Sequence, residues 1–425
     1  MKQGWEIKKL SEIGKVFNGN SINEKVKKEK YTGLDDGLPF IATKDVSFDS
    51  EIDYENGVRI PLNEINQFKI APSNTPLICA EGGSAGRKIG FTNQDVCFGN
   101  KLFALVPNKN ADSKYVYYYY FTSSFQKHFS TEMAGIIGGV SMNKFKDIEI
   151  PLPPLPEQQR IVSILDEAFA AIAKAKANAE QNLKNAKELF ESYLQGMFEN
   201  GNWETKKLSE VAKHSLGKML DKNKNKGEPK EYLRNQNVRW FEFDLSDLNE
   251  MPFLENEKEK YTAIKGDVMI CEGGYPGRAA IWEEDYPIYF QKAIHRVRFH
   301  DEEYNKWFLF YLFILDKTGK LKNHFTGTGI QHFTGDALGK LILPFPPLDK
   351  VKTIVRQLDA LRAETQKLEA VYQKKIDDLE ELKKSILQKA FAGELRSPEG
   401  AEYKSEVATP LADKKPNTIT SPEGV

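Results

Sequence analysis

The sequence predicts a mixed α+β fold of the α/β class, in which two copies of one domain are separated by two long helices. These helices are expected to pair as an antiparallel intramolecular coiled coil. Two observations predict this fold: segments of the first half recur in the second half, and a long apolar heptad pattern follows each copy. Recurrence at a fixed offset is typical of repeat architectures.

The repeat is clearest at the start of each copy and at its end. Residues 5–13, WEIKKLSEI, return as residues 203–211, WETKKLSEV, and the proline-rich segment 151–156, PLPPLP, returns at 344–348 as PFPPL. Proline has no amide hydrogen and disfavours helix in the residue before it. A helix is therefore expected to begin just beyond each proline-rich segment.

The first of these helices, 157–198, carries apolar residues at a spacing of seven. The two seam positions hold Ile161, Ala168, Ala175, Asn182 and Leu189, and Leu165, Ile172, Ala179, Ala186 and Tyr193. This spacing predicts a coiled-coil arm, which needs a partner helix.

A second arm, 350–391, supplies that partner. Its seam positions hold Ile354, Leu361, Leu368 and Leu382, and Leu358, Thr365, Tyr372, Leu379 and Ile386, with an interruption at Lys375. The first arm leads from one domain to the next and the second leaves that next domain, so the two arms can pair only in antiparallel orientation.

These patterns divide the chain into five parts. We predict one domain at 1–150, an arm at 151–200, a second domain at 201–343, a second arm at 344–396 and a disordered tail at 397–425, in which Ser-Pro-Glu-Gly occurs twice. Short apolar runs at 38–42, 75–80, 88–92 and 101–106 predict the strands of a loop-rich sheet.

Composition limits the classes of protein that fit. The 425 residues are 40% hydrophobic and carry a net charge of −1, and no run of about 18 apolar residues or apolar signal core is visible. We therefore expect a cytoplasmic protein without membrane association. Three cysteines suggest reduced, buried side chains rather than a disulfide framework or a zinc site.

A net charge near zero argues against strong DNA binding by the chain alone, because DNA binding rests on neutralising phosphates. Local clustering changes this expectation, since residues 221–240 hold six basic residues against three acidic ones. Small basic patches on a neutral chain indicate DNA binding inside a larger complex.

A glycine loop, 81–87 (EGGSAGR), recurs as 272–278 (EGGYPGR). It matches neither a phosphate-binding P-loop nor a dinucleotide fingerprint. Two interpretations stay open: a hairpin whose glycines adopt positive φ, and a backbone loop that brings Arg87 or Arg278 to DNA.

Two further features follow the glycine loop in each copy. The aromatic run 115–121 and its counterpart at 304–315 fit a helix packed in the core better than a platform for stacking bases. The loops 135–143 and 327–335 differ in side chains on matched scaffolds, and such loops commonly determine specificity.

Three segments together resemble the DNA specificity subunit of Type I restriction-modification systems. They are 231–238 (EYLRNQNV), 266–274 (GDVMICEGG) and 151–162 (PLPPLPEQQRIV). The resemblance covers residues 1 to about 396. The first copy departs from it at 40–46, which lacks the counterpart of Arg234, and the second proline-rich segment departs from it at 349–352.

The resemblance implies two target recognition domains held apart by the two helical arms. It implies docking of two methyltransferase subunits and, with restriction (nuclease/translocase) subunits, assembly of a restriction enzyme on double-stranded DNA. Arms of about 60 Å, from a 1.5 Å rise per residue, would hold the two domains on separate half-sites of an asymmetric, bipartite target.

No catalytic residue, metal site or cofactor is predicted in this chain. The Asn/Asp-Pro-Pro-aromatic motif of adenine methyltransferases does not occur, and the six histidines lack metal-ligand spacing. S-adenosylmethionine is expected only in the partner methyltransferase. Two rival hypotheses remain, a structural protein whose coiled coil spaces two domains and an enzyme that uses the glycine loops on a nucleotide.

The DNA contacts are assigned by residue type. Phosphate contacts are predicted for Lys25, Lys27, Lys28, Lys222, Lys224 and Lys226. Base-edge contacts are predicted for Lys44, Arg87, Arg234, Asn235, Asn237, Arg278, Gln331 and His332, since Arg suits guanine and Asn or Gln suits adenine.

Overall fold

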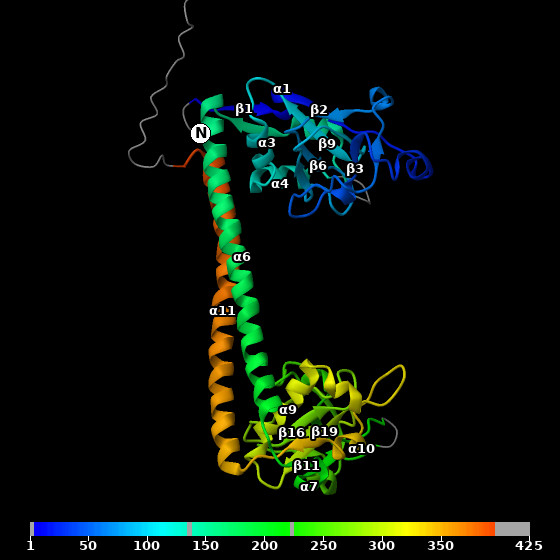
Figure 1. The fold of residues 1–425 in the computed structure, drawn as a ribbon, viewed down its shortest axis with the longest axis vertical. Helices are drawn as coiled ribbons and strands as arrows, with labels where there is room; N and C mark the ends of the chain where they lie inside the picture. The colour runs from blue at the N-terminus through cyan, green and yellow to red at the C-terminus, as the bar shows by residue number, and fades with distance from the viewer. Residues whose placement is uncertain (1–3, 134–137, 222–224, 396–425) are drawn as a thin grey trace, which may run out of the picture. The chain divides into compact units, whose positions relative to one another are not determined.

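A computed structural model describes residues 4–133, 138–221 and 225–395. The chain forms two compact units (Figure 1): unit 1 joins the residues up to Ala173 with those from Glu380 onward, and unit 2 is Lys174–Leu379. The predicted tail 397–425 lies outside the described residues. Among the described residues, no helix is both long and apolar enough to cross a membrane.

Unit 1 contains two four-stranded sheets and a two-stranded one, in the orders β2-β9-β6-β7, β4-β3-β8-β5 and β1-β10. The strands are β1 (Glu6–Lys9), β2 (Gly14–Asn18), β3 (Leu38–Ile41), β4 (Arg59–Ile60), β5 (Ile70–Ala71), β6 (Pro76–Cys79), β7 (Ile89–Phe91), β8 (Val96–Phe98), β9 (Leu102–Pro107) and β10 (Glu149–Leu152). The helices are α1 (Leu10–Ile13), α2 (Glu24–Val26), α3 (Ser113–Tyr119), α4 (Ser123–Thr131), α5 (Met142–Asp147) and the start of α6 (Leu155–Asn200), with short turns at Lys27–Tyr31 (η1), Thr43–Asp45 (η2) and Ile65–Gln67 (η3).

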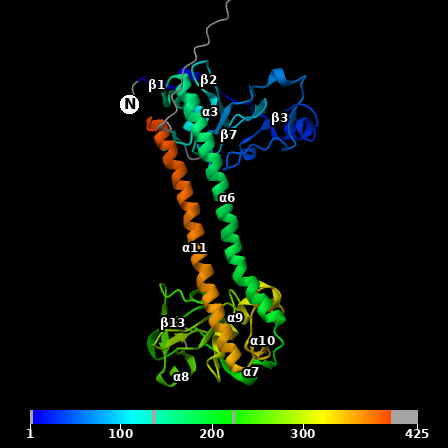
Figure 2. The same cartoon turned by 60° about the vertical axis from the view of Figure 1, so that its left-hand side comes forward.

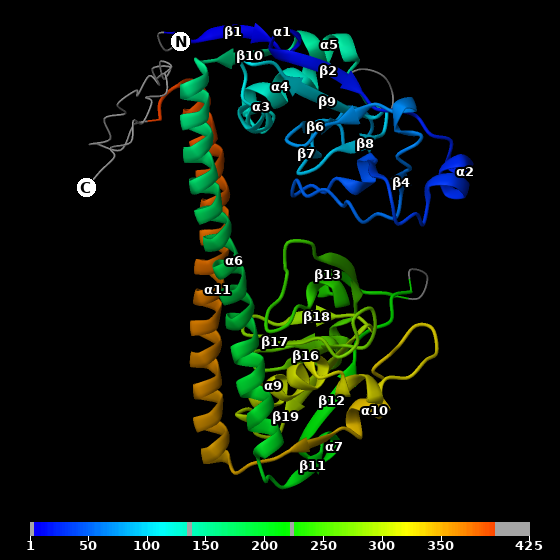
Figure 3. The same cartoon turned by 45° about the horizontal axis from the view of Figure 1, so that its top comes forward.

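Unit 2 repeats this topology with sheets β12-β19-β16-β17, β14-β13-β18-β15 and β11-β20 (Figure 3). The strands are β11 (Thr205–Lys207), β12 (Ala212–Leu216), β13 (Glu228–Leu233), β14 (Asn249–Phe253), β15 (Thr262–Ala263), β16 (Val268–Cys271), β17 (Ala279–Ile281), β18 (Ile288–Phe290), β19 (Ile294–Phe299) and β20 (Ile342–Pro344). The helices are α7 (Leu208–Val211), α8 (Lys258–Tyr261), α9 (Tyr304–Lys317), α10 (Gly335–Gly339) and α11 (Leu348–Ala392), with turns at Asn235–Asn237 (η4), Glu255–Glu257 (η5) and Lys320–His324 (η6). The predicted repeat and the mixed α+β class are confirmed.

The aromatic runs form the core, as the sequence predicted, and they are placed alike in both units. Tyr115 and Tyr119 on α3 are buried, and their hydroxyls donate to the carbonyls of Pro151 and Glu149. In unit 2, Trp307 Nε1 and the Tyr311 hydroxyl on α9 donate to the carbonyls of Pro344 and Ile342. Tyr115 and Tyr119 on α3 therefore correspond to Trp307 and Tyr311 on α9, each 192 residues later in the sequence.

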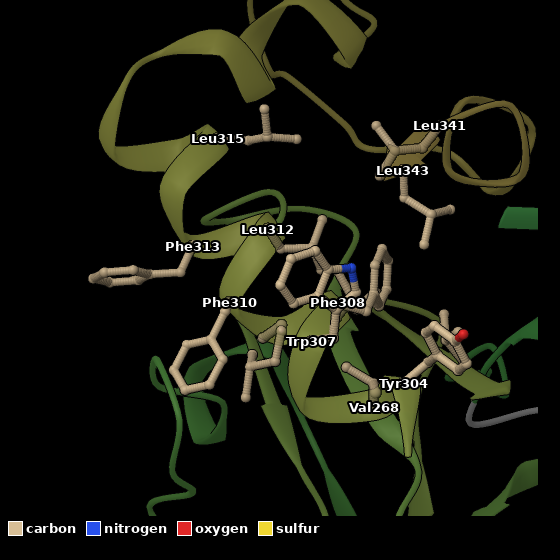
Figure 4. Close-up of a cluster of buried hydrophobic side chains, with 14 of the residues drawn as sticks. Val268, Tyr304, Trp307, Phe308, Phe310, Leu312, Phe313, Leu315, Leu341 and Leu343 are labelled. Carbon is tan, nitrogen blue, oxygen red and sulfur yellow. The ribbon is translucent and has the colours of Figure 1, made fainter. Parts of the chain in front are cut away.

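The largest apolar cluster of unit 2 surrounds α9. Figure 4 shows Trp307, Phe308 and Leu312 directed toward Leu343, while Phe310 and Phe313 project from the opposite side of the helix. Trp307 and Phe308 are fully buried. Complete burial of a large aromatic side chain contributes several kcal/mol, so α9 anchors unit 2.

The two arms, α6 and α11, pack against each other within each unit (Figure 2). In unit 1, Ile161 and Leu165 near the start of α6 share a buried cluster with Leu387 and Ala390 near the end of α11. In unit 2, the order is reversed, and Phe190 and Leu194 share a cluster with Val351, Ile354 and Leu358. These pairings confirm the antiparallel arrangement.

On α6, the predicted seam position of Leu165 is buried as far as Ala186, whereas that of Ile161 is buried at Ile161 and exposed at Asn182 and Leu189. Ile172, Ala179 and Ala186 are buried, but Leu189 and Tyr193 are 50% and 44% exposed, and Phe190 and Leu194 are buried instead. The prediction for Leu189 and Tyr193 was wrong because α6 turns its buried face toward α9 after Ala186.

On α11, the predicted seam position of Ile354 is buried at Ile354 but fails further along, where Leu368 and Leu382 are 40% and 46% exposed. A straight helix of 3.6 residues per turn drifts by about 20° per heptad, so a strict seven-residue seam rotates outward.

The three cysteines, Cys79, Cys97 and Cys271, are free and buried, as predicted. Burial raises the pKa of the Cys97 thiol to about 11. Within the described ranges, no group of His, Cys, Asp and Glu side chains is arranged to hold a metal ion.

A buried histidine makes unit 2 sensitive to acid. Burial lowers the pKa of His295 to about 4, and its Nε2 lies 2.9 Å from the Phe333 carbonyl, which it meets as the neutral N–H donor. Between pH 6.5 and 4 the unfolded chain binds this proton and the folded chain does not. We expect stability to fall by about 3 kcal/mol as pH drops through this window.

Urea unfolding of the chain at pH 7 and at pH 5 checks this expectation. His295→Gln should reduce the loss of stability between the two pH values, whereas His300→Gln, at an exposed position, should leave it as in the wild type. An unchanged pH dependence in His295→Gln would show that other groups cause the acid sensitivity.

Candidate nucleic-acid interface

Three loops meet on unit 2: the η4 turn, the glycine loop 272–278 and the hairpin 326–332, which is closed by a bridge between Thr326 and His332. Asn235 Nδ2 donates to the Gly273 carbonyl at 3.0 Å, and Arg278 Nη2 donates to the Asn235 carbonyl at 3.0 Å. The Phe333 amide donates to the Glu272 carbonyl at 2.8 Å. These bonds join loops that are far apart in the sequence into one cluster.

The glycines make this close approach possible. Gly274 has a φ of 78°, and a Cβ at this position would lie 2.2 Å from Asn235 Nδ2. Gly82, Gly86 and Gly277 also have positive φ, which L-residues with side chains rarely adopt. The hairpin interpretation of the two glycine loops is therefore confirmed.

Unit 1 brings the matching loops together. The Gly82 amide donates to the Gly138 carbonyl at 2.8 Å, and Lys88 Nζ donates to the Thr43 carbonyl of the η2 turn at 3.0 Å. The Arg87 guanidinium lies over the Phe48 ring, 4.9 Å from its centre. Of the predicted loop 135–143, residues 135–137 lie outside the described part of the chain.

Two of the residues predicted to contact bases, Arg234 and Asn237, form hydrogen bonds within unit 2. Arg234 Nη2 donates to the carbonyl and to Oδ2 of Asp247, at 2.6 and 2.8 Å. Asn237 is 2% exposed; its Oδ1 accepts from the Arg234 backbone amide, and its Nδ2 donates to the carbonyls of Asp244 and Asp247. Both side chains hold the η4 turn in shape, which is a structural role that the residue types did not reveal.

Asn235 and Arg278 lie at the centre of the cluster and are partly exposed. They bond each other's loops, and the Arg278 guanidinium also lies over the exposed Tyr275 ring at 5.0 Å. These two bonds connect the glycine loop to the η4 turn.

The other predicted readers are exposed. Lys44 and Arg87 belong to the loop cluster of unit 1, and Gln331 and His332 belong to the hairpin of unit 2. A Cβ on Gly273 would lie 3.1 Å from His332 Nδ1, so the histidine ring rests directly against the glycine loop.

The lysines predicted to contact phosphate are spread over two loops. Lys25 and Lys28 are exposed on α2 and η1, where Lys27 pairs with Glu24 at 2.5 Å, and Lys226 is exposed before β13. Lys222 and Lys224 lie outside the described residues. Of the described lysines in this set, Lys25, Lys27 and Lys28 therefore belong to unit 1 and Lys226 belongs to unit 2.

Lysines 88 and 292 belong to the loop clusters and were missed by the sequence reasoning. Lys292 is exposed and lines a cavity of about 530 Å³ together with Glu272, Thr326 and His332. Lys88 directly follows the glycine loop, which was a usable signal. Lys292 comes shortly after β18, and no local sequence pattern indicates where this strand ends.

The clusters can present rigid backbone and exposed Lys, Arg, Gln and His side chains to a polar partner. Arg and Gln side chains offer the donor and acceptor pairs that distinguish base edges, and lysines offer point charges for phosphates. The bonds described above fix the backbone of these loops relative to one another.

The chain matches the family model described as the Type I restriction modification DNA specificity domain twice, at residues 2–184 and 200–380. The protein therefore belongs to the Type I restriction-modification DNA specificity family and carries two copies of its domain.

Individual relatives are similar along nearly the whole chain. The EcoKI specificity subunit of Escherichia coli strain K12 is 24% identical over 95% of this chain and 91% of its own length, and the MjaVIII specificity subunit of Methanocaldococcus jannaschii is 23% identical over 93% of each.

Solved structures share the fold. A chain from a study of assembly and conformational transition in a type I R-M system superposes with a TM-score of 0.74 at 16% identity, over 93% of this chain and 99% of that one. The HsdS subunit of Thermoanaerobacter tengcongensis superposes with a TM-score of 0.58 at 17% identity, over 93% and 98%.

Proposed function

We propose that this chain is the non-catalytic DNA-recognition subunit of a Type I restriction-modification complex. Each unit reads one half-site of an asymmetric, bipartite target in double-stranded DNA. Two methyltransferase subunits, which bind S-adenosylmethionine, supply modification, and restriction subunits supply cleavage.

One observation carries this proposal: the same three-loop cluster occurs in both units with different side chains. The η2 turn is Thr-Lys-Asp where η4 is Asn-Gln-Asn, and the glycine loops differ at Ser84-Ala85 and Tyr275-Pro276. Matched scaffolds with different exposed groups suit two different short sequences.

We assign each of these residues to a base contact, a phosphate contact or a supporting role according to its exposure and its hydrogen bonds. Lys44, Arg87, Gln331 and His332 are proposed to meet base edges, with Asn235 and Arg278 positioned behind them. Lys25, Lys28, Lys226 and Lys292 are proposed to meet phosphates. Arg234 and Asn237 are proposed to support the η4 turn.

The proposal predicts that DNA binding depends on the partner subunits. With a net charge of −1, the chain alone should bind DNA weakly at physiological salt, and the complex with methyltransferase subunits should bind tightly, with steep salt dependence. Fluorescence anisotropy of a labelled duplex, titrated with the chain or the complex at several salt concentrations, measures both. Tight, sequence-specific binding by the chain alone would contradict the dependence on partners.

Two arginines distinguish a reading role from a supporting one. Arg87→Ala should weaken DNA binding by the complex by about 1–3 kcal/mol and leave the melting temperature unchanged, because the side chain is exposed. Arg234→Ala should lower stability by about 1–2 kcal/mol, because it removes the bonds to Asp247. The reverse pattern, a stable Arg234→Ala protein that has lost discrimination at one half-site, would restore Arg234 as a base reader.

A further inference from the structure

Unit 1 contains a largely apolar cavity of about 720 Å³, whose lining includes no residue of the η2 turn or of the glycine loop 81–87. It lies between the α3–α4 corner, the first half of α6 and the last turns of α11. Its lining includes Ser50, Tyr118, Phe121, Phe169 and Lys383.

The matching place in unit 2 can be found residue by residue. Tyr115 and Tyr119 on α3 correspond to Trp307 and Tyr311 on α9, which lie 192 residues later in the sequence. By the same offset, Tyr118 and Phe121 correspond to Phe310 and Phe313. On the arms, the offset between corresponding residues is 193. The Phe391 ring contacts Tyr115 and Tyr119, and the Phe198 ring, 193 residues earlier, makes the equivalent contacts with Trp307 and Tyr311. Lys383 therefore corresponds to Phe190, and Phe169 corresponds to Arg362.

The loops after the 3₁₀ turns also correspond. Each is closed by one bridge, between Val46 and Ile52 in unit 1 and between Val238 and Phe243 in unit 2. Each contains one residue other than glycine with positive φ, Ser50 at 70° and Phe241 at 69°. Ser50 therefore corresponds to Phe241.

In unit 2 this place is filled with aromatic rings. The Phe241 ring lies 5.6 Å from Phe310 and 5.0 Å from Phe313, and the Phe190 ring lies 6.0 Å from each. The Arg362 guanidinium lies over the Phe241 ring at 4.1 Å. Figure 4 shows Phe310 and Phe313 projecting from the side of α9 that lies opposite Trp307 and Leu312.

Unit 1 has aromatic residues at the positions of Phe310 and Phe313 but none at the positions of Phe241 and Phe190. Tyr118 and Phe121 remain, but Phe241 is replaced by Ser50 and Phe190 by Lys383. Phe48, near the same loop, is 55% exposed and lies under Arg87 instead. A cation is still present, because Lys383 Nζ lies over the Phe169 ring at 5.3 Å.

We infer that this cavity is a docking site for an aromatic side chain of a partner polypeptide, which takes the place that Phe241 fills in unit 2. The walls supply rings for edge or offset contacts, and Lys383 supplies a cation for the face of the incoming ring. Such a buried aromatic anchor is the usual centre of a protein–protein contact. The two units therefore differ at this place, which is open in unit 1 and filled by aromatic rings in unit 2.

The chain itself provides a probe, the hexapeptide of residues 239–244, Arg-Trp-Phe-Glu-Phe-Asp. Fluorescently labelled peptide is titrated with the full chain in the absence of DNA, and its anisotropy is measured. We expect saturable binding by the wild type, and none when Ala replaces the three aromatic residues of the peptide. Because no DNA is involved, failure here leaves the proposed function untouched.

Self-filling variants locate the site. Ser50→Phe and Lys383→Phe copy the residues of unit 2, so each should lower peptide affinity at least tenfold while circular dichroism stays as in the wild type. Phe241 shows that phenylalanine is compatible with this loop conformation. Lys389→Phe is the matched control, with the same substitution at an exposed position of α11 outside the cavity, and it should bind like the wild type.

Three results would overturn the inference. These are no binding by the wild type, equal binding by the wild type and both self-filling variants, and at least tenfold tighter binding after truncation beyond Leu395. The last result would show that residues 396–425 of the chain itself occupy the cavity.

Discussion

Replacing Arg298 with methionine is expected to lower the free energy of unfolding by about 3–5 kcal/mol, because it leaves a buried carboxylate without its cation. Asp267 is 1% exposed, and its two oxygens accept from Arg298 Nε and Nη2 at 2.7 Å each. The Ile264 amide supplies one further bond at 2.8 Å. A loss of this size is a large part of the stability of an ordinary domain.

Urea unfolding of the single and double variants measures this effect. Arg298→Met combined with Asp267→Asn should recover part of the loss, because a neutral amide is less costly to bury than an unpaired carboxylate. Lys213→Met, at an exposed position paired with Arg298 across β12 and β19, is the control and should change stability little. If the double variant were less stable than Arg298→Met, the unpaired charge would not be the cause.

The repeat, the fold class and the two arms could be predicted because each leaves a local or periodic mark in the sequence. The proline segments give the start of each arm to within two residues, since α6 and α11 begin at Leu155 and Leu348. The exposure of Leu189 could not be predicted, because the face that α6 buries after Ala186 depends on where Phe310 and Phe313 lie.

The candidate site was predictable only as a set of loops. Residue type suggested base contacts for Arg234 and Asn237, but their bonds to Asp244 and Asp247 form across a loop that carries no periodic pattern. The aromatic cavity of unit 1 was not predictable either, since it depends on segments that meet only in the fold. The sequence difference that indicates the cavity is the presence of Ser50 and Lys383 at positions where the second copy has phenylalanine.

A four-residue insertion after Ala179 is expected to abolish modification of the original genomic targets and to create a new set. Four residues lengthen a helix by about 6 Å, which corresponds to at most two base pairs of DNA. The buried seam has to re-pair, because four residues do not match the heptad. We therefore expect a partly active complex that reads the same two half-sites across a longer spacer.

The matched control keeps the length of the arm. Alanine at the exposed positions Asn178, Glu180 and Gln181 changes the same stretch of α6 without moving its ends, and should leave the targets unchanged. If the control also lost the original targets, the loss in the insertion variant would reflect damage to the arm rather than a change of distance.

Sequencing of methylated adenines in cells that carry the complex with the wild-type or the insertion chain tests most directly whether two separate readers are joined by a spacing arm. We expect two half-sites with unchanged bases and an unspecified spacer longer by one or two base pairs. Altered half-site bases with a constant spacer would contradict it.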